Sequence, residues 1–369
     1  ADSYKVTKNQ ITFTHGTSGQ AVDKDALYES ITEAVDSGDY ETVISAPMKD
    51  SQPKALDIDK VYKKVYTKAK DATLDPKNNY AIVASTTGVS FDKKEAAAAI
   101  EGLEEGESKS ISLKLTTADI TTQNLEKNLF KDRLGGYSTN VAGTAARINN
   151  VRLASQHCNN TILLPGETFS YNEVVGQRTA ARGFQEAGAY LNGKTVQELG
   201  GGICQVSSTL YLCSLYAEMD IVDRVSHGYP ANYMPVGLDA TVSWGSPDLK
   251  ISNPYSTPVK IVAESTEGFV KIWLMGTETR DYTVRMAFGS SSDGYARSYY
   301  CRYKDGQLIE KTDAALSGYL SVNVPTRGEI GSDEIYRNGN IRQEPIGEPD
   351  AKTLEDSKNH RPPNTGSQS

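Results

Sequence analysis

The first third of this 369-residue chain contains an internal repeat, which restricts the folds that the chain can adopt. The sequence TSGQAVDK at residues 17–24 returns as TTGVSFDK at residues 86–93. In both copies a strand-like run and a glycine turn precede the aspartate, whose carboxylate can cap a following helix. A glycine, a second strand-like run and a short helix then follow. We therefore expect two duplicated α+β units, at residues 1–74 and 78–134.

The composition changes after the repeats. Residues 137–277 are rich in glycine, tyrosine and proline and contain two long helical patterns, at residues 141–159 and 203–219. In the second pattern, apolar residues from Val206 to Ala217 recur at intervals of four, three and four, which places them on one helix face. We expect this helix to be buried in a mixed α+β domain.

The C-terminal part divides into a short β region and a polar tail. Strand-like runs on either side of a Lys-Asp-Gly turn predict a small β module at residues 279–325. Residues 333–369 contain few apolar side chains and much glycine, proline, asparagine and charge, so we expect a flexible tail. The fold class is then α+β and multidomain, with two duplicated units, a mixed α+β domain and a C-terminal β module.

Charge and composition exclude several classes of protein. The 39 lysines and arginines against 47 aspartates and glutamates give a net charge of −8, so nucleic acid is not an expected partner. No apolar run approaches the roughly 18 residues that a membrane span requires. The cysteines and histidines show no CxxC or HxxxH spacing, and we expect neither a metal nor another cofactor. The start at Ala1, without methionine, suggests that a targeting or anchoring segment has been removed or omitted.

Residues 188–195 match the GxxxxGK[ST] pattern of a nucleotide-binding loop. Such a loop needs a strand before it and a long helix directly after it. Here Asn192-Gly193 favours a two-residue turn between two strand-like runs. We therefore predict a β-hairpin at this position and no nucleotide as a partner.

The strongest chemical signal is the segment Gly200-Gly201-Gly202-Ile203-Cys204-Gln205, because its glycines allow a tight turn directly before the buried helix. Cys204 then lies at the N-terminus of that helix, where free amides and the helix dipole favour a thiolate. The amides of Cys204 or Gln205 can also stabilise an oxyanion. A packing cysteine after a structural turn is the alternative. Cys213, on the apolar face, is expected to be a buried hydrophobic residue.

A cysteine nucleophile needs a partner that exchanges protons, and an imidazole is the usual one. Among the four histidines, only His227 falls in a glycine- and proline-rich loop of the same domain, so it is the candidate base. Asp239 precedes a strand-like run and can orient that imidazole. A carboxylate that caps a turn is an equally good interpretation of Asp239.

Two arginines four residues apart, Arg178 and Arg182, have the paired N–H donors that bind a substrate carboxylate. Exposed structural salt bridges are the alternative for both. We also expect Gly202, Gln205 and Ser207, which surround the candidate nucleophile in sequence, to contact the substrate.

Together these residues resemble the VanW family. The block GGGICQVSSTLY at residues 200–211 is highly specific for it, and the resemblance covers about residues 137–277. His227 matches the family's histidine, although Gly228 follows where serine is common. Further matching segments are residues 165–172, 175–183, 237–242 and 248–253. The duplicated N-terminal units are similar, more weakly, to a domain regarded as peptidoglycan-binding that often precedes the VanW domain in Gram-positive surface proteins.

The resemblance implies an activity. Some VanW members are assigned L,D-transpeptidase activity with the motif cysteine as nucleophile, so Cys204 is expected to attack the peptide bond between the diamino acid and D-Ala of a peptidoglycan tetrapeptide. A second stem peptide then resolves the acyl-enzyme and forms a 3-3 crosslink. The Ser-His-Gly-Cys signature of the better-known L,D-transpeptidase fold is absent, so a shared activity would be convergent.

The resemblance also implies partners and a location. The expected partners are peptidoglycan stem peptides and glycan. The expected location is outside the cell, facing the wall, with a membrane anchor in an N-terminal segment absent from this chain. Two other functions stay open: a non-catalytic peptidoglycan-binding wall protein, or a cysteine peptidase in which water replaces the acceptor amine.

Overall fold

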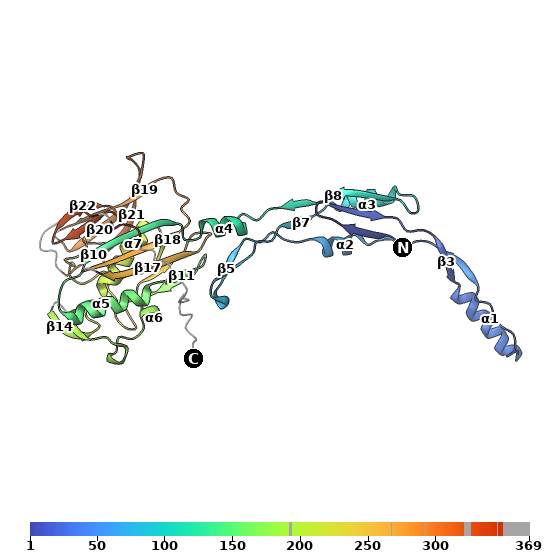
Figure 1. The fold of residues 1–369 in the computed structure, drawn as a ribbon, viewed down its shortest axis with the longest axis horizontal. Coiled ribbons are helices and arrows are strands. Elements are labelled where there is room, and N and C mark those ends of the chain that lie inside the picture. The colour runs from blue at the N-terminus through green and yellow to red at the C-terminus, as the bar shows by residue number, and fades with distance from the viewer. Residues whose placement is uncertain (192–193, 267, 292, 321–325, 345, 350–369) are drawn as a thin grey trace. The chain divides into compact units, whose positions relative to one another are not determined.

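The computed structural model describes residues 1–349, apart from 192–193, 267, 292, 321–325 and 345. The chain is a mixed α+β, multidomain protein that divides into two compact units (Figure 1). Residues 1–72 and 84–122 form the first unit, and residues 73–83 and 123–369 form the second. The second duplicated unit was expected to end at residue 134, whereas the first compact unit of the structure ends at residue 122. Among the described helices, each is too short or too polar to cross a bilayer.

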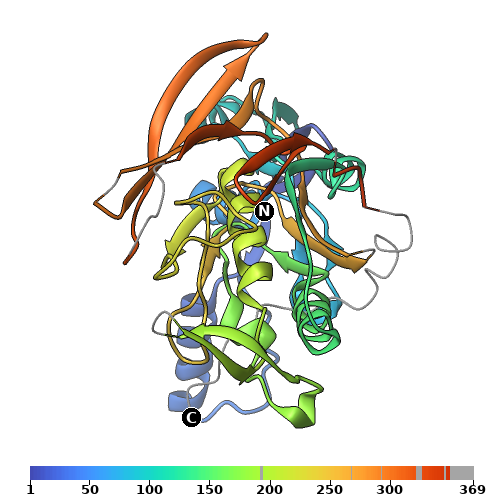
Figure 2. The same cartoon turned by 90° about the vertical axis from the view of Figure 1, so that its left-hand side faces the viewer.

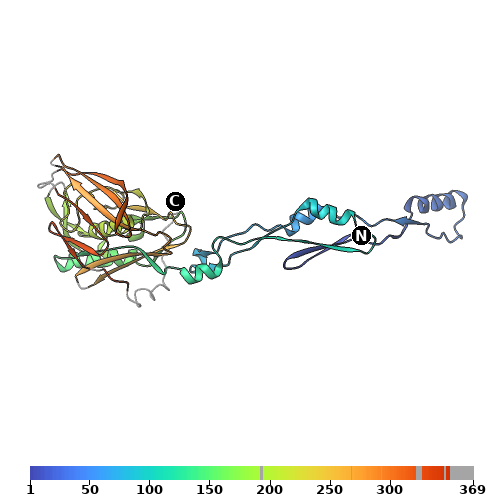
Figure 3. The ribbon, with the colours of Figure 1, turned by 90° about the horizontal axis from the view of Figure 1, so that it is seen from above.

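The first unit, blue to cyan in Figure 3, contains a three-stranded antiparallel sheet. Its strand order is β1 (Ser3–Val6), β2 (Gln10–Thr14) and β8 (Ser108–Ser112), so the beginning and the end of the unit share one sheet. Helices α2 (Ile58–Val65) and α3 (Lys93–Glu101) pack together, and α3 contacts the sheet. The buried core comprises Ile11, Phe13, Val61, Phe91, Ala96, Ala99, Ile111 and Leu113.

Two strand–helix–strand segments of this unit share one order of elements. Strands β3 (Gly19–Val22) and β4 (Met48–Ser51) pair antiparallel around α1 (Lys24–Ser37). Strands β7 (Gly88–Ser90) and β9 (Lys114–Thr116) pair in the same way around α3. The predicted caps are confirmed, because Asp23 and Asp92 each accept from two backbone amides at the start of these helices. The helices differ in burial, since α1 buries no residue and α3 buries two alanines.

The second unit is built on a four-stranded antiparallel sheet that carries two helices. The strand order is β10 (Asp132–Asn140), β18 (Phe269–Gly276), β17 (Val259–Thr266) and β11 (Thr161–Leu163). Helices α5 (Ala145–Cys158) and α7 (Cys204–Tyr216) contact this sheet and each other, and α7 runs through the middle of the unit in Figure 2. All residues of α7 after Cys204 are buried, which confirms the burial predicted from its apolar pattern.

Close packing of α7 on the sheet depends on a glycine. A Cβ atom on Gly135 of β10 would lie 2.5 Å from the carbonyl oxygen of Cys213, so only glycine lets the helix approach this far. The shorter elements of the chain are β5 (Thr73–Asp75), β6 (Ala81–Val83), α4 (Thr122–Asn128), β12 (Thr168–Ser170), α6 (Tyr171–Val175), β15 (Asp220–Asp223), β16 (Lys250–Ser252) and two single 3-10 turns, Pro76–Asn78 and Ala180–Arg182.

The C-terminal strands form a second four-stranded sheet, in the order β21 (Gln307–Gly318), β20 (Tyr295–Lys304), β19 (Thr283–Ser290) and β22 (Arg327–Ile330). The predicted turn between β20 and β21 is present at Asp305-Gly306, where both residues have positive φ. The sheet is not a separate module at residues 279–325, because it extends to Ile330 and four of its buried side chains belong to the same core as α7. These four are Met286, Phe288, Ala296 and Ile330.

The region expected to be a flexible tail begins with a hairpin. Strands β23 (Glu334–Arg337) and β24 (Asn340–Gln343) pair antiparallel, and the backbone N–H of Tyr336 donates to the hydroxyl of Tyr137 in β10. The prediction of a tail from residue 333 is therefore wrong for this hairpin, since buried Ile335 anchors it in the unit. Residues 350–369 lie outside the described part of the chain.

Candidate active site

The candidate nucleophile begins α7 directly after the triple-glycine turn. A Cβ on Gly201 would lie 2.2 Å from the carbonyl oxygen of Ala187, and Gly202 has a φ of +102°, so both positions require glycine. Cys204 is the first residue of α7 and is half-buried. Within the described chain no acceptor pairs with its backbone N–H, whereas the N–H of Gln205 donates to the carbonyl of Gly202 (3.0 Å). The amide of Cys204 is thus the one available for an oxyanion.

The structure brings His227 and Asp239 to this thiol. Nδ1 of His227 donates to Oδ2 of Asp239 (2.6 Å), and the backbone N–H of His227 donates to the same oxygen (2.7 Å). Asp239 is 1% exposed. Because Nδ1 is bonded to the carboxylate, the other ring nitrogen, Nε2, is the one that makes the hydrogen bond with Cys204. The three residues therefore form a continuous thiol–imidazole–carboxylate chain.

The electrostatics of this chain favour a thiolate and an imidazolium. Burial raises the pKa of Cys204, but the hydrogen bond and positive charge of His227 outweigh it and lower that pKa below its usual value. Burial alone would lower the pKa of His227, but its hydrogen bonds to Asp239 and Cys204 outweigh burial, so the pKa of His227 is raised. Burial likewise raises the pKa of Asp239, while His227 and Arg224 bring it below the usual range. Asp239 thus stays ionised and supports the ion pair.

Arg178 supplies buried positive charge next to the thiol. Its side chain is 8% exposed and lies over the rings of Tyr171 (5.7 Å) and Trp244 (5.9 Å). Nη2 donates to Oδ1 of Asn172 (2.8 Å), but Nε and Nη1 have no acceptor among the described residues. Since buried donors are normally paired, two unpaired guanidinium nitrogens close to Cys204 indicate a place for an anionic group.

Other residues expected to bind substrate have different surroundings. The exposed guanidinium of Arg182 donates to the carbonyl of Gln177 (2.7 Å) and contacts His157 (3.4 Å), so the structure does not bring it to the thiol. Gln205 is 1% exposed and uses both ends of its amide inside the protein, with Arg147, Thr139 and Asn140.

Ser207 and Gly202 also depart from the expected substrate contacts. The buried hydroxyl of Ser207 donates to the carbonyl of Ala240 (2.8 Å), which ties α7 to the segment after Asp239. A Cβ on Gly202 would lie 2.7 Å from Cγ of Arg147, so this glycine makes room for a neighbouring side chain. Both residues shape the site from behind the thiol.

Two further residues contact Asp239 and were not found from the sequence. The hydroxyl of Tyr319, directly after β21, donates to Oδ1 of Asp239 (2.5 Å). Arg224, directly after β15, donates through Nε to the Asp239 carbonyl (2.6 Å) and lies 3.4 Å from Oδ1 through Nη2. No local pattern marks either residue, because the contacts join segments that are distant in the chain.

The segment with the nucleotide-binding pattern forms a hairpin, as predicted. Strand β13 (Glu186–Leu191) pairs antiparallel with β14 (Lys194–Leu199), and Leu191 lies opposite Lys194. The lysine of the pattern, Lys194, therefore begins a strand and not a helix. The turn residues, 192–193, lie outside the described part of the chain.

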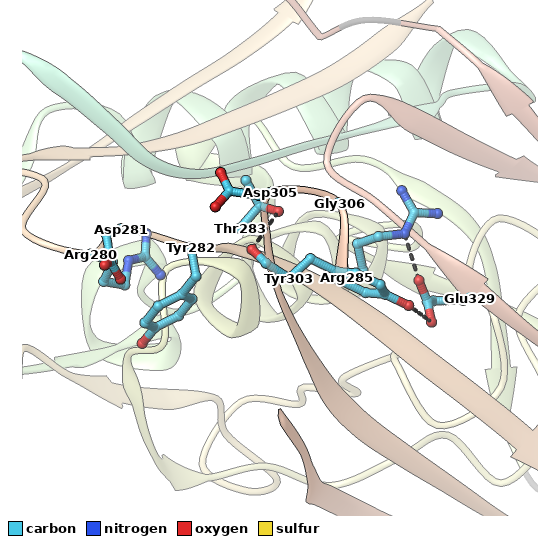
Figure 4. Close-up of a pocket in the computed structure, with 9 residues that line it drawn as sticks. All are labelled: Arg280, Asp281, Tyr282, Thr283, Arg285, Tyr303, Asp305, Gly306 and Glu329. Carbon is cyan, nitrogen blue, oxygen red and sulfur yellow. Dashed lines mark hydrogen bonds and ion pairs between the residues drawn. The ribbon is translucent and has the colours of Figure 1, made fainter. Parts of the chain in front are cut away.

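A cavity of about 720 Å³ lies away from the thiol, against the C-terminal sheet (Figure 4). Its arginines are paired with carboxylates: Arg280 with Glu278 (2.6 Å) and Arg285 with Glu329 (2.6 Å). The hydroxyl of Tyr303 also donates to Glu329 (3.0 Å). The arginines of this cavity are therefore already paired, unlike Arg178 in the thiol site.

Comparison with known proteins gives matches over the part of the chain that contains this site. Residues 146–275 match the family model described as VanW like protein. The chain therefore contains a VanW-like segment. It is 39% identical over 154 residues to "Uncharacterized protein YoaR" of Bacillus subtilis, covering 42% of this chain and 51% of that protein. It is 32% identical over 112 residues to "Vancomycin B-type resistance protein VanW" of Enterococcus faecalis, covering 29% of this chain and 41% of that protein.

The chain thus spans about half the length, or less, of these curated relatives, and no solved structure matches it. The matched VanW segment contains Cys204, His227, Asp239 and Arg178. Tyr319 lies beyond its end, in the part of the fold that the family match does not include.

Proposed function

We propose that this protein is a peptidoglycan L,D-transpeptidase that forms 3-3 crosslinks through an acyl-enzyme on Cys204. The observation that supports this most is the arrangement of Cys204, at a helix N-terminus, with an imidazole that a buried carboxylate holds in one tautomer. This arrangement provides a nucleophile, a proton carrier and an oxyanion donor for acyl transfer.

In the first step the Cys204 thiolate attacks the carbonyl carbon of the diamino acid, in the peptide bond to D-Ala. The negative charge that forms on the carbonyl oxygen is stabilised by the backbone N–H of Cys204 and the dipole of α7. The imidazolium of His227 gives its Nε2 proton to the leaving amine as the C–N bond breaks. The products are a thioester on Cys204, neutral His227 and free D-Ala.

In the second step an amine of a second stem peptide attacks the thioester. His227 accepts the proton that this amine loses, the C–S bond breaks, and the thiolate–imidazolium pair is restored. The new amide joins the diamino acids of two stem peptides, which is a 3-3 crosslink. If water attacks instead, the same site is a peptidase.

Arg178 gives this reaction its donor specificity. In a tetrapeptide the leaving D-Ala carries a free carboxylate, one residue beyond the bond that breaks. The unpaired Nε or Nη1 of Arg178 can donate a charge-assisted hydrogen bond to that carboxylate. The exposed ring of Trp244 borders this position on the solvent side. A donor without the terminal carboxylate would leave these buried N–H groups unsatisfied.

A wall-facing location agrees with this function. One relative carries the name of a vancomycin B-type resistance protein. We infer that the protein works outside the cytoplasmic membrane, on stem peptides and glycan. The first unit is then the part that holds peptidoglycan.

The test is mass spectrometry of purified muropeptides incubated with the protein and with Cys204→Ala. The expected result is a 3-3 crosslinked dimer with release of D-Ala, lost in the variant. Cys301→Ala is the matched control, because it removes a buried sulfur from the C-terminal sheet. Tripeptide without dimer would instead show a peptidase. No product from a folded protein would favour a binding protein.

A further inference from the structure

The C-terminal sheet reaches into the site through Tyr319, which lies outside the matched VanW segment. The hydroxyl of Tyr319 accepts from the backbone N–H of Gly237 (2.6 Å), so its own hydrogen is directed to Oδ1 of Asp239. Burial and the charge of Asp239 raise the pKa of Tyr319, which keeps the hydroxyl protonated and able to donate. Tyr319 is 7% exposed, so water does not replace this bond easily.

Arg224 holds the same carboxylate from a second direction. Its Nη1 donates to the hydroxyl of Ser317 at the end of β21 (2.6 Å), and its guanidinium lies 4.9 Å from the ring of Tyr211 in α7. Together with the bonds to Asp239, these contacts connect Arg224 to the helix that carries the nucleophile and to the C-terminal sheet.

The backbone of the same strand end also fixes the His227 loop. The hydroxyl of Ser226 donates to the carbonyl of Gly318 (3.2 Å), and the N–H of Leu320 donates to the carbonyl of Gly228 (2.8 Å). The residues on both sides of His227 are therefore attached to the residues on both sides of Tyr319. Such a two-sided attachment determines where the imidazole lies.

We propose that Tyr319 and Arg224 are positioning residues for the reaction, and that the C-terminal sheet is a required part of the active site. The inference rests on the proposed role of Cys204 as the nucleophile. Oδ2 of Asp239 serves His227, while Oδ1 is held by Tyr319 and Arg224. A buried carboxylate needs such partners to remain ionised, and only the ionised form stabilises the imidazolium.

Other ionisable groups act on the same three residues. Asp239 interacts electrostatically with Tyr211 and Tyr233, and Cys204 with Tyr171, Tyr233, Arg147 and Arg178. None of them is changed in the variants below, so their contribution is constant. A shift in thiol reactivity can then be assigned to the bonds on Oδ1.

The test measures the pH profile of Cys204 alkylation by iodoacetamide in the full chain, with modified sites identified by peptide mass spectrometry. Tyr319→Phe keeps the ring and removes one donor. The charge on Asp239 is then less stabilised, the imidazolium is weakened, and the midpoint of thiolate formation moves to higher pH. A shift of about one pH unit lowers the rate about tenfold at pH values well below both midpoints and leaves the rate unchanged well above them.

Tyr295→Phe, on an exposed tyrosine of the same sheet, is the matched control and should give the wild-type profile. In an Asp239→Asn background, Tyr319→Phe should add no further shift. Melting temperatures confirm that the variants are folded. A purely structural role would lower the melting temperature and leave the midpoint in place.

A folded Tyr319→Phe with the wild-type profile overturns the proposal, as does an equal shift in the Asp239→Asn background. If Tyr319→Phe does not fold, Ser317→Ala must show a smaller shift of the same sign, because it frees one end of Arg224. Absence of that shift also overturns the proposal. Alkylation does not require transfer, so a shifted profile without crosslinked product would contradict the transpeptidase function alone.

Discussion

Two regions of the second unit contain a cysteine near charged side chains, yet only one has the features of a catalytic site. At the start of α7, the thiol of Cys204 faces an imidazolium, and two nitrogens of Arg178, Nε and Nη1, have no acceptor among the described residues. Near the cavity of Figure 4, burial and the charge of Glu329 raise the pKa of Cys301, and the arginines pair with carboxylates. The difference shows that uncompensated donors and an activated thiol, and not the volume of a cavity, indicate chemistry.

The largest expected effect comes from removing the nucleophile. Cys204→Ala should reduce crosslink formation at least about a thousandfold, because the variant lacks the activated thiol that forms the acyl-enzyme. Cys301→Ala should keep wild-type transfer, since its thiol is buried and disfavoured as a thiolate. Both rates are measured by the appearance of dimeric muropeptides. Substantial crosslinking by Cys204→Ala would remove the distinction between the two regions.

Removing the proton carrier should have the next largest effect. His227→Ala is expected to slow acylation by about two to four orders of magnitude, because the leaving amine loses its proton donor and the thiolate loses its counter-charge. Intact-protein mass spectrometry in a single turnover measures the thioester directly. His157→Ala, which changes a histidine that stacks on Phe184, is the control and should acylate normally. Equal rates in the two variants would exclude His227 as the base.

The two arginines of the expected carboxylate clamp show what spacing alone could and could not predict. A separation of four residues suggests one face of a helix, but only the single turn Ala180–Arg182 forms here, and it ends at Gly183 with a φ of +84°. Arg178 therefore points into the core and Arg182 toward the surface. Sequence supplied the residue type, and the local backbone decided which of the two reaches the thiol.

Arg178→Lys should lower kcat/KM for a tetrapeptide donor by about 10- to 100-fold, because lysine keeps the charge and loses the directed guanidinium donors. Arg285→Lys in the cavity region and Arg182→Lys at the surface are controls with the same change of side chain, and both should keep wild-type kinetics. A donor whose terminal carboxylate is amidated should make wild type and Arg178→Lys nearly equal. If the amidated donor reacts as fast as the acid in wild type, Arg178 does not bind that carboxylate.

Local signals predicted the site better than they predicted its support. The glycine turn, the helix N-terminus and a single suitable histidine are features of short segments, and these identified Cys204 and His227. The contacts of Tyr319 and Arg224 with Asp239 arise from tertiary packing of separate elements, which no local pattern records. The C-terminal hairpin was missed for a related reason, since a few apolar side chains, Ile335, Tyr336 and Ile341, pack an otherwise polar segment against the core.

The smallest expected effect is a difference in pH dependence between the two thiols. A thiolate is present above the pKa of its thiol, so the lowered pKa of Cys204 keeps it reactive as the pH falls below the usual cysteine range. Between pH 8.5 and pH 7, iodoacetamide alkylation of Cys204 should slow less than that of an ordinary thiol, which with a pKa of about 8.5 slows roughly fifteenfold. Unfolding in urea should give all four cysteines the ordinary profile, because the His227 contact is lost and Glu329 no longer opposes the thiolate of Cys301. A folded-state profile for Cys204 that matches the urea profile would mean that the imidazole does not activate this thiol, and the contrast with Cys301 would then reflect exposure alone.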